Sequence, residues 1–192
     1  MTLQRIVVEL DAGPRARAAL EAAAQLAERM QAELVGLFVE DVELLHLAGL
    51  PFAREVGYPS ATLRPLDVAA MERALRAAAH DMQRSLAAVA GRGPLSWSFR
   101  TARAAVPAAL RAAAAEGGIV VSCALRLSLR APLGVLCTAA LPPEQAVAAA
   151  AALAAAVGGA VEIVLLDGED GAAEDWRRRA RELLAADAPV RV

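Results

Sequence analysis

Two acidic residues in the first apolar segment of the chain are candidates for chemistry. Glu9 and Asp11 are two residues apart, so their carboxylates project from the same face if the segment is a strand. In that geometry the pair could share a metal cation, as a metal-dependent nucleotide hydrolase would need. Alternatively, Asp11 contacts a bound ligand or caps the turn into the next helix, and an arginine holds Glu9. The two residues alone leave these alternatives open.

A second candidate is a basic segment later in the chain. Arg126 and Arg130, with the hydroxyl of Ser122, carry donors that can hold a phosphate or another anion through charged hydrogen bonds. Arg100 and Arg103, at the end of a strand-like segment, could point toward the same place. The alternative for the basic segment is a solvated connector without a ligand.

Other residue types with catalytic potential are scarce. His46 and His80 are the only histidines, and their positions do not match the spacing of metal ligands. The sequence contains no lysine, which excludes a phosphate-loop lysine and a Schiff-base lysine. It also contains no Gly-x-Ser-x-Gly elbow and no Gly-x-Gly-x-x-Gly motif. We therefore predict a protein that is not an enzyme and has no metal site.

Strand-like and helix-like segments alternate along the chain and must position these residues. This alternation predicts an α/β fold with a doubly wound, open and mainly parallel sheet, in which ligands bind at the carboxyl ends of the strands. Strands are expected at residues 5–10, 33–39, 96–103, 119–123, 134–138 and 160–166. Helices are expected at residues 15–30, 68–89, 106–116, 142–157 and 175–186.

The order of elements starts again near Pro132. Residues 6–41 can be laid over residues 134–170 with a one-residue gap, although alanine-rich segments match easily by composition alone. We therefore expect an α/β domain over residues 1–130. Residues 131–192 are expected to form a partial second repeat, with two or three strands and two helices, that packs on the first domain.

The segment IVVELDAGPRARAALEAAAQLAERMQAELVGLFVED resembles the opening of universal stress proteins. In that family a first strand ends in Asp, a helix follows, and Ala-Glu-Leu introduces the second strand. Residues 106–123 are similar to the family's later helix and fourth strand, and a weaker resemblance recurs from Pro132. The resemblance implies a universal-stress-protein-like fold of the adenine nucleotide alpha hydrolase-like superfamily and a stress-related regulatory or binding role.

The resemblance also implies where a ligand would lie. In family members that bind ATP, the strand-end Asp and a residue of the second strand contact the adenosine, and Asp11 and Val39 match these positions. The family's Gly-x2-Gly-x9-Gly-Ser/Thr phosphate loop has no counterpart, because no glycine follows the fourth strand before Gly134. We therefore predict a weak, degenerate site for ATP, ADP, AMP or another anion, with no cofactor assigned. Its candidate residues are Asp11, Val39, Ser122, Arg126 and Arg130. The alternative is a structural or protein-interaction module whose site is empty.

Composition and surface patterning bear on partners. The net charge of −2 does not favour nucleic acid or an anionic membrane. The first residues lead straight into a strand without the pattern of a signal peptide, so we expect a cytoplasmic protein.

The uncharged run at 146–161 is interrupted by glycines and predicts a buried helix followed by a strand, not a membrane span. A leucine-rich stretch at 44–52 suits a lid, a homodimer surface or a helix completing the core. We expect a homodimer and allow for another protein partner.

Overall fold

Seven strands form one sheet in the described part of the chain. The computed structural model describes residues 5–11, 16–57, 60–116, 118–122, 133–166, 171–184 and 189–191. The strand order is β5-β2-β1-β6-β7-β8-β9, and every neighbouring pair is parallel except β6 and β7. The strands of this sheet are β1 Arg5–Glu9, β2 Glu33–Asp41, β5 Trp97–Ala104, β6 Ile119–Ser122, β7 Leu133–Cys137, β8 Val161–Leu165 and β9 Val190–Arg191. The expected mainly parallel sheet is confirmed.

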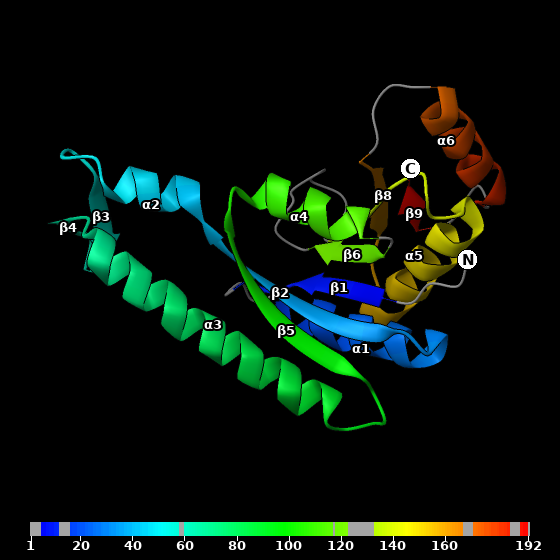
Figure 1. The fold of residues 1–192 in the computed structure, drawn as a ribbon, viewed down its shortest axis with the longest axis horizontal. Helices are drawn as coiled ribbons and strands as arrows, with labels where there is room; N and C mark the ends of the chain where they lie inside the picture. Colours follow the sequence, from blue (N-terminus) through cyan, green and yellow to red (C-terminus); the bar gives the residue numbers. More distant parts are fainter. Residues whose placement is uncertain are drawn as a thin grey trace.

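Helices cover both faces of this sheet, as a doubly wound fold requires. Figure 1 shows α1 and α4 on opposite sides of β1. Helices α1, α3, α5 and α6 contribute to the larger core on one face, and α4 packs on the other face. The helices are α1 Ala16–Met30, α2 Val42–Ala48, α3 Val68–Ala90, α4 Val106–Ala115, α5 Pro143–Val157 and α6 Gly171–Leu183. The α/β class predicted from the sequence is therefore confirmed.

The apolar run of β1 explains why it lies in the interior of the sheet. Ile6 and Val8 belong to the core beneath α1, whereas Val7 packs with Leu110 of α4 on the other face. All three β1 side chains are fully buried, because a strand covered on both faces must be apolar at successive positions. Short alanine side chains dominate the buried surfaces of α1 and α5, which lets these two helices approach each other closely.

Helix α3 is attached to the sheet through its C-terminal half. Leu86 is fully buried against β2, and its Cδ2 atom lies 2.6 Å from where a Cβ at position 36 would stand. The Cδ1 atom of Leu10 lies 2.9 Å from the same point. A side chain at Gly36 would therefore force the buried Leu86 and Leu10 side chains to shift at the contact between α3 and the sheet.

The N-terminal half of α3 supports an arm that projects from the sheet (Figure 1). We define the arm as the described residues 42–79, which comprise α2, the start of α3 and an antiparallel hairpin of β3 Arg54–Gly57 and β4 Thr62–Pro65. The leucine-rich stretch at 44–52 lies on this arm, where Leu47 is 49% exposed and Phe52 is 73% exposed. The alternative that this stretch completes the core is therefore wrong.

The strand-helix-strand units β1-α1-β2 and β7-α5-β8 occupy the two segments that align in sequence. Each unit pairs its own two strands in parallel, and the antiparallel pair β6–β7 joins the two groups of strands. The uncharged run at 146–161 is not one continuous helix. Helix α5 ends at Val157, Gly158 adopts a left-handed φ of 63°, and β8 begins at Val161. Among the residues with described placement, no helix has the length and apolar character needed to cross a membrane.

Truncation of Leu86 tests the attachment of α3. We expect Leu86→Ala to lower the free energy of unfolding by about 2–5 kcal/mol, because it leaves a cavity at the α3–β2 contact. Urea denaturation followed by circular dichroism measures this change. The matched control is Leu183→Ala on α6, where the side chain is 45% exposed outside the arm and the expected change is below about 0.5 kcal/mol. Equal effects of the two substitutions would contradict the assignment.

Candidate functional site

The strand order places a topological switch point between β1 and β6. From β1 the chain passes through α1 to β2 on one side, and from β5 it returns through α4 to β6 on the other side. Connections that leave a strand in opposite directions open a space at the carboxyl ends of the two central strands, and ligands bind there in open α/β sheets. The residues at the carboxyl ends of β1 and β6 are therefore the first place to look for a site.

Two buried polar side chains meet at this position. Glu9 and Ser122 are 4% and 0% exposed, and they are the buried polar residues of the described part of the chain. The register pairs Val8 with Val121, so the next residue of each strand lies beside the other at the end of the pairing. The hydroxyl of Ser122 donates a hydrogen bond to Glu9 Oε2. An arginine was one expectation for the partner of Glu9, and the structure places a serine there.

Burial controls the protonation of Glu9. Removal from water raises the pKa of the Glu9 carboxyl above its ordinary value of 4.5, because desolvation penalises the charged form. The hydrogen bond from Ser122 acts in the opposite direction, and the negative charge of Asp11 raises the pKa further. The carboxyl is thus held by one hydroxyl donor and faces a second carboxylate, which favours its neutral form.

Asp11 and Val39 lie next to this pair. Asp11 follows Glu9 by two residues and is half-buried, and the backbone N–H of Leu10 donates to the carbonyl of Leu37 at 2.8 Å. Leu37 pairs with Glu9 in the sheet, so Val39 continues along β2 beside the end of β1. We call Glu9, Asp11, Val39 and Ser122 the switch-point group. Three of the five residues expected from the sequence are therefore brought to one edge of the sheet.

The remaining sequence candidates do not join this group in the described structure. Arg126 and Arg130 lie outside the described residues. The Nη1 atom of Arg100 donates to Glu116 at the end of α4 at 2.7 Å. On the α3 side of the sheet, Arg103 bonds Glu40 at 2.9 Å and forms an ion pair with α3. The expectation that Arg100 and Arg103 point toward the same site is wrong, because carboxylates on neighbouring elements hold both of them.

A metal-dependent reaction finds little support in the described residues. Within them, no group of three or more histidine, cysteine or carboxylate side chains is close enough to hold a metal ion. Glu9 and Asp11 do lie near each other, but Ser122 already bonds the Glu9 carboxyl and burial favours its neutral form. A neutral carboxyl is a poor ligand for a divalent cation.

The Glu9–Ser122 contact was missed from the sequence, although a signal for it is present. The tripeptide Ile-Val-Val occurs at residues 6–8 and again at 119–121, and each copy is followed by one polar residue. The two tripeptides pair residue for residue in the sheet. Two buried strands with the same apolar pattern, each ending in a polar residue, predict that those two polar residues meet when the strands are neighbours.

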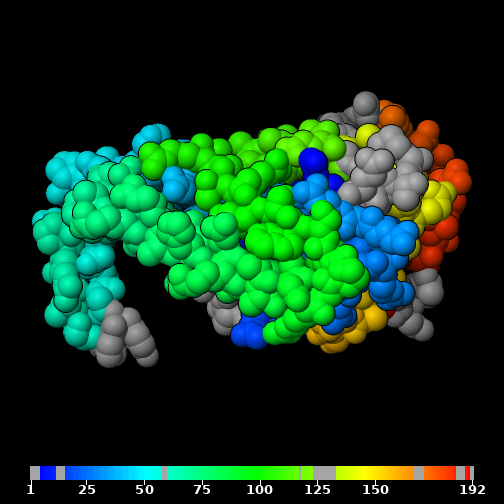
Figure 2. Space-filling view, turned by 60° about the horizontal axis from the view of Figure 1, so that its bottom comes forward, coloured from blue at the N-terminus to red at the C-terminus, as the bar shows by residue number. Residues whose placement is uncertain are grey.

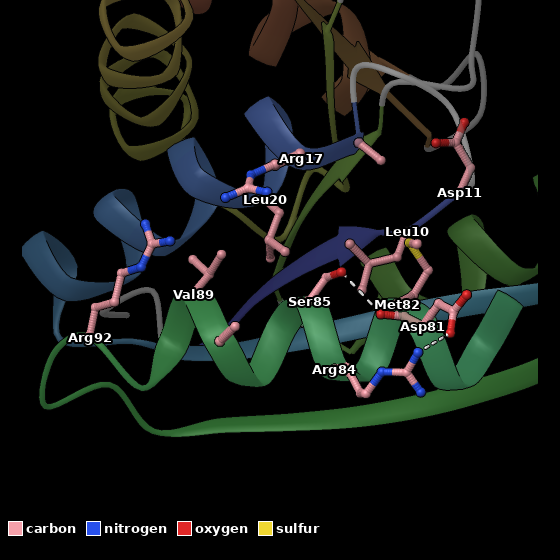
Figure 3. Close-up of a pocket in the computed structure, with 12 residues that line it drawn as sticks. Leu10, Asp11, Arg17, Leu20, Asp81, Met82, Arg84, Ser85, Val89 and Arg92 are labelled. Atoms are coloured by element: carbon pink, nitrogen blue, oxygen red, sulfur yellow. Dashed lines mark hydrogen bonds and ion pairs between the residues drawn. The ribbon is translucent and has the colours of Figure 1, made fainter.

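A groove of about 390 Å³, which shares Asp11 with the switch-point group, lies between α1 and α3 (Figure 3). Leu10, Leu20 and Val89 contribute to its apolar lining, and Asp11 lies at one end with its carboxylate pointing away from α3. Three arginines stand around it, but each forms an ion pair: Arg17 and Arg92 with Glu21, and Arg84 with Asp81. The groove therefore offers no cluster of uncompensated positive charge for an anion.

Comparison with known proteins adds little to this geometry. No model of a protein family matches the sequence, and no curated protein matches it. Among solved structures, a universal stress protein from Archaeoglobus fulgidus is similar at 15% sequence identity, with a TM-score of 0.26. That alignment covers 99% of this chain and 93% of the other. Values this low establish neither a family nor a function.

The buried carboxyl predicts a specific dependence of stability on pH. Below the pKa of Glu9 in the unfolded chain, the group is protonated in both states and its contribution to stability is fully present. As the pH rises from that value through the higher pKa of the folded state, the unfolded chain releases its proton first, so the fold loses stability. The loss can reach at most about 1.4 kcal/mol per pH unit.

Glu9→Gln removes this titration and keeps an acceptor for Ser122. We expect the variant to match the wild type near about pH 4 and to exceed it in stability near about pH 8. Urea denaturation at a series of pH values measures the difference. Glu182→Gln, on the exposed surface of α6, is the control and should leave the pH profile unchanged. Identical profiles for Glu9→Gln and the wild type would show that Glu9 ionises normally in the folded protein.

Proposed function

We propose that this chain is a non-catalytic binding module of the universal-stress-protein type, with a regulatory role and a weak site for an adenine nucleotide at the switch-point group. The observation that carries the proposal is the buried Glu9–Ser122 pair at the carboxyl ends of β1 and β6. Buried polar groups cost stability unless they are well paired, and sites that bind ligands retain them in spite of that cost.

The chemistry of the switch-point group suits the nucleoside part of such a ligand. The half-buried carboxylate of Asp11 can accept hydrogen bonds from ribose hydroxyls, and the half-buried side chain of Val39 can pack against a base. These are also the two positions at which the sequence resembles the adenosine contacts of universal stress proteins. The Glu9–Ser122 pair would fix the end of β1, which carries Asp11.

The proposal has less support for how the phosphate groups of the nucleotide would be bound. A glycine-rich loop would offer backbone N–H groups, and the sequence from Ser122 to Pro132 contains no glycine. The proposal assigns this role to the guanidinium groups of Arg126 and Arg130, which can hold phosphate oxygens in pairs. Contacts made by long arginine side chains in place of backbone amides imply weak affinity and little discrimination between ATP, ADP and AMP.

A protein-interaction module with an empty site is the second candidate. It is favoured by the apolar side chains on the arm, which are exposed far from the switch-point group. The two candidates differ in what they predict for nucleotide, because an interaction module gains no stability from it.

Thermal unfolding with AMP, ADP and ATP tests the proposal. A ligand at one hundred times its dissociation constant stabilises the folded state by about 2.7 kcal/mol, so a millimolar nucleotide should raise the melting temperature of the wild type measurably. We expect Asp11→Ala to abolish most of this rise. Glu182→Ala is the matched control, since it removes an exposed carboxylate from α6 and should keep the full rise. No rise with any nucleotide would favour the second candidate.

A further inference from the structure

The exposed apolar side chains of this chain are concentrated on the arm. Nine large apolar residues of the described structure are exposed, and seven of them belong to the arm. Those outside it are Trp97 and Leu183. The seven arm residues, which we call the arm patch, are Leu44, Leu47, Leu50, Phe52, Val56, Leu63 and Val68. Soluble monomers seldom expose this much apolar surface in one region, so the arm patch indicates an interaction surface.

The hairpin of the arm has one face that is apolar except for Arg54 at its end, and one face that is charged. Val56 lies directly opposite Leu63 in the register, and these two side chains are 66% and 69% exposed. Glu55 and Arg64 form the neighbouring pair and therefore project from the other face. A two-stranded hairpin is at best marginally stable in water, and it needs cover on its apolar face. Its residues thus have the pattern of a surface that packs against a partner.

The rest of the described residues does not supply that cover. Strands β3 and β4 make their main contacts with each other, and α2 packs on α3 and β5. Figure 2 shows the hairpin end of the arm as a hook at one end of the molecule, far from α5 and α6. We therefore look to another molecule for the occupant of the arm patch.

The charges of the arm do not favour an anionic occupant and are compatible with a second copy of the chain. Its described residues carry four carboxylates, Glu43, Glu55, Asp67 and Glu72, and four guanidinium groups, Arg54, Arg64, Arg73 and Arg76. The net charge is zero, which gives no attraction to nucleic acid or to an anionic membrane. Two copies of such an arm do not repel each other, and a two-fold axis can place the carboxylates of one copy near the arginines of the other.

The size of the surface also fits a second copy. Seven large side chains that are each between 37% and 73% exposed offer several hundred Å² of apolar area. A standard stable interface buries roughly 800 Å² on each partner, including its polar rim. The arm patch and the charged residues around it are of that order. A symmetric contact doubles the buried area without requiring a second specialised surface elsewhere on the chain.

We propose that the arm is a self-association surface, through which two copies of this chain form a symmetric dimer with the apolar faces of their hairpins packed together. This inference rests on the arm alone and does not depend on the nucleotide site. Phe52, as the most exposed large side chain and an aromatic one, is expected to lie near the centre of the contact.

Sedimentation velocity on the full chain tests the dimer. We expect the wild type to sediment as a dimer at micromolar concentration, and Phe52→Glu or Leu63→Glu to weaken dimerisation at least about tenfold, because each buries a charge in the contact. Leu183→Glu is the matched control on α6, where the side chain is 45% exposed outside the arm, and it should leave the dimer intact.

Two further measurements keep the test decisive. If an arm variant fails to fold by circular dichroism, the wild type alone is informative, because a dimer melts at a temperature that rises with protein concentration. A monomeric wild type with a melting temperature independent of concentration would overturn the proposal, as would a dimer that survives both arm substitutions. Pelleting of a monomeric wild type with phosphatidylcholine vesicles would assign the arm patch to a lipid surface instead.

Discussion

A carboxyl group that is buried at the end of a central strand sets the main constraint on this fold. Glu9 lies where β1 and β6 end together, and the hydroxyl of Ser122 donates a hydrogen bond to its carboxyl group. Desolvation makes the charged form costly, so the strands, the register and the hydroxyl must all stay in place for the carboxyl to be tolerated. A valine or isoleucine there would pack into the core without this cost. Core packing therefore does not explain this polar pair, whereas its position at the carboxyl ends of β1 and β6 does.

The same register that brings Glu9 to Ser122 also determines what surrounds them. Strands β2 and β5 continue beyond the last paired residue of β1, and the chain then turns into α2 and the arm. Arg103 joins this extension to α3 through Glu40 and Glu72. On the opposite side, β7 pairs antiparallel with β6 and covers the edge that β6 would otherwise expose. The switch-point group thus lies between the extended ends of β2 and β5 on one side and the edge of β6, which β7 covers, on the other.

Much of the fold could be predicted from periodicity. Runs such as Ile6-Val7-Val8 and the three-and-four spacing in α3 correctly indicated strands and a helix, because burial on both faces or on one face leaves a distinct pattern. The arm could not be predicted. Short apolar segments such as residues 44–52 have the same composition whether they lie inside a core or face solvent, and only the tertiary placement of α3 separates the two cases.

The candidate site was predicted in part. Asp11, Val39 and Ser122 could be placed at strand ends, since each follows an apolar run and parallel strands end at a common edge. The partner of Glu9 required the register of β1 against β6, which no local pattern determines. Arg100 and Arg103 were misplaced because an arginine at a strand end has several carboxylates within reach, and the sequence does not tell which of them it contacts.

Hydrogen exchange with and without an adenine nucleotide tests most directly whether the switch-point group is a ligand site. The account predicts slower exchange of backbone amides in peptides that cover residues 5–11, 37–41 and 119–122, with no change in α5 and α6. Protection confined to the α1–α3 groove, or to α5 and α6, would place the ligand elsewhere and contradict the account. Unchanged exchange throughout at saturating nucleotide would show that the buried Glu9–Ser122 pair serves the fold alone.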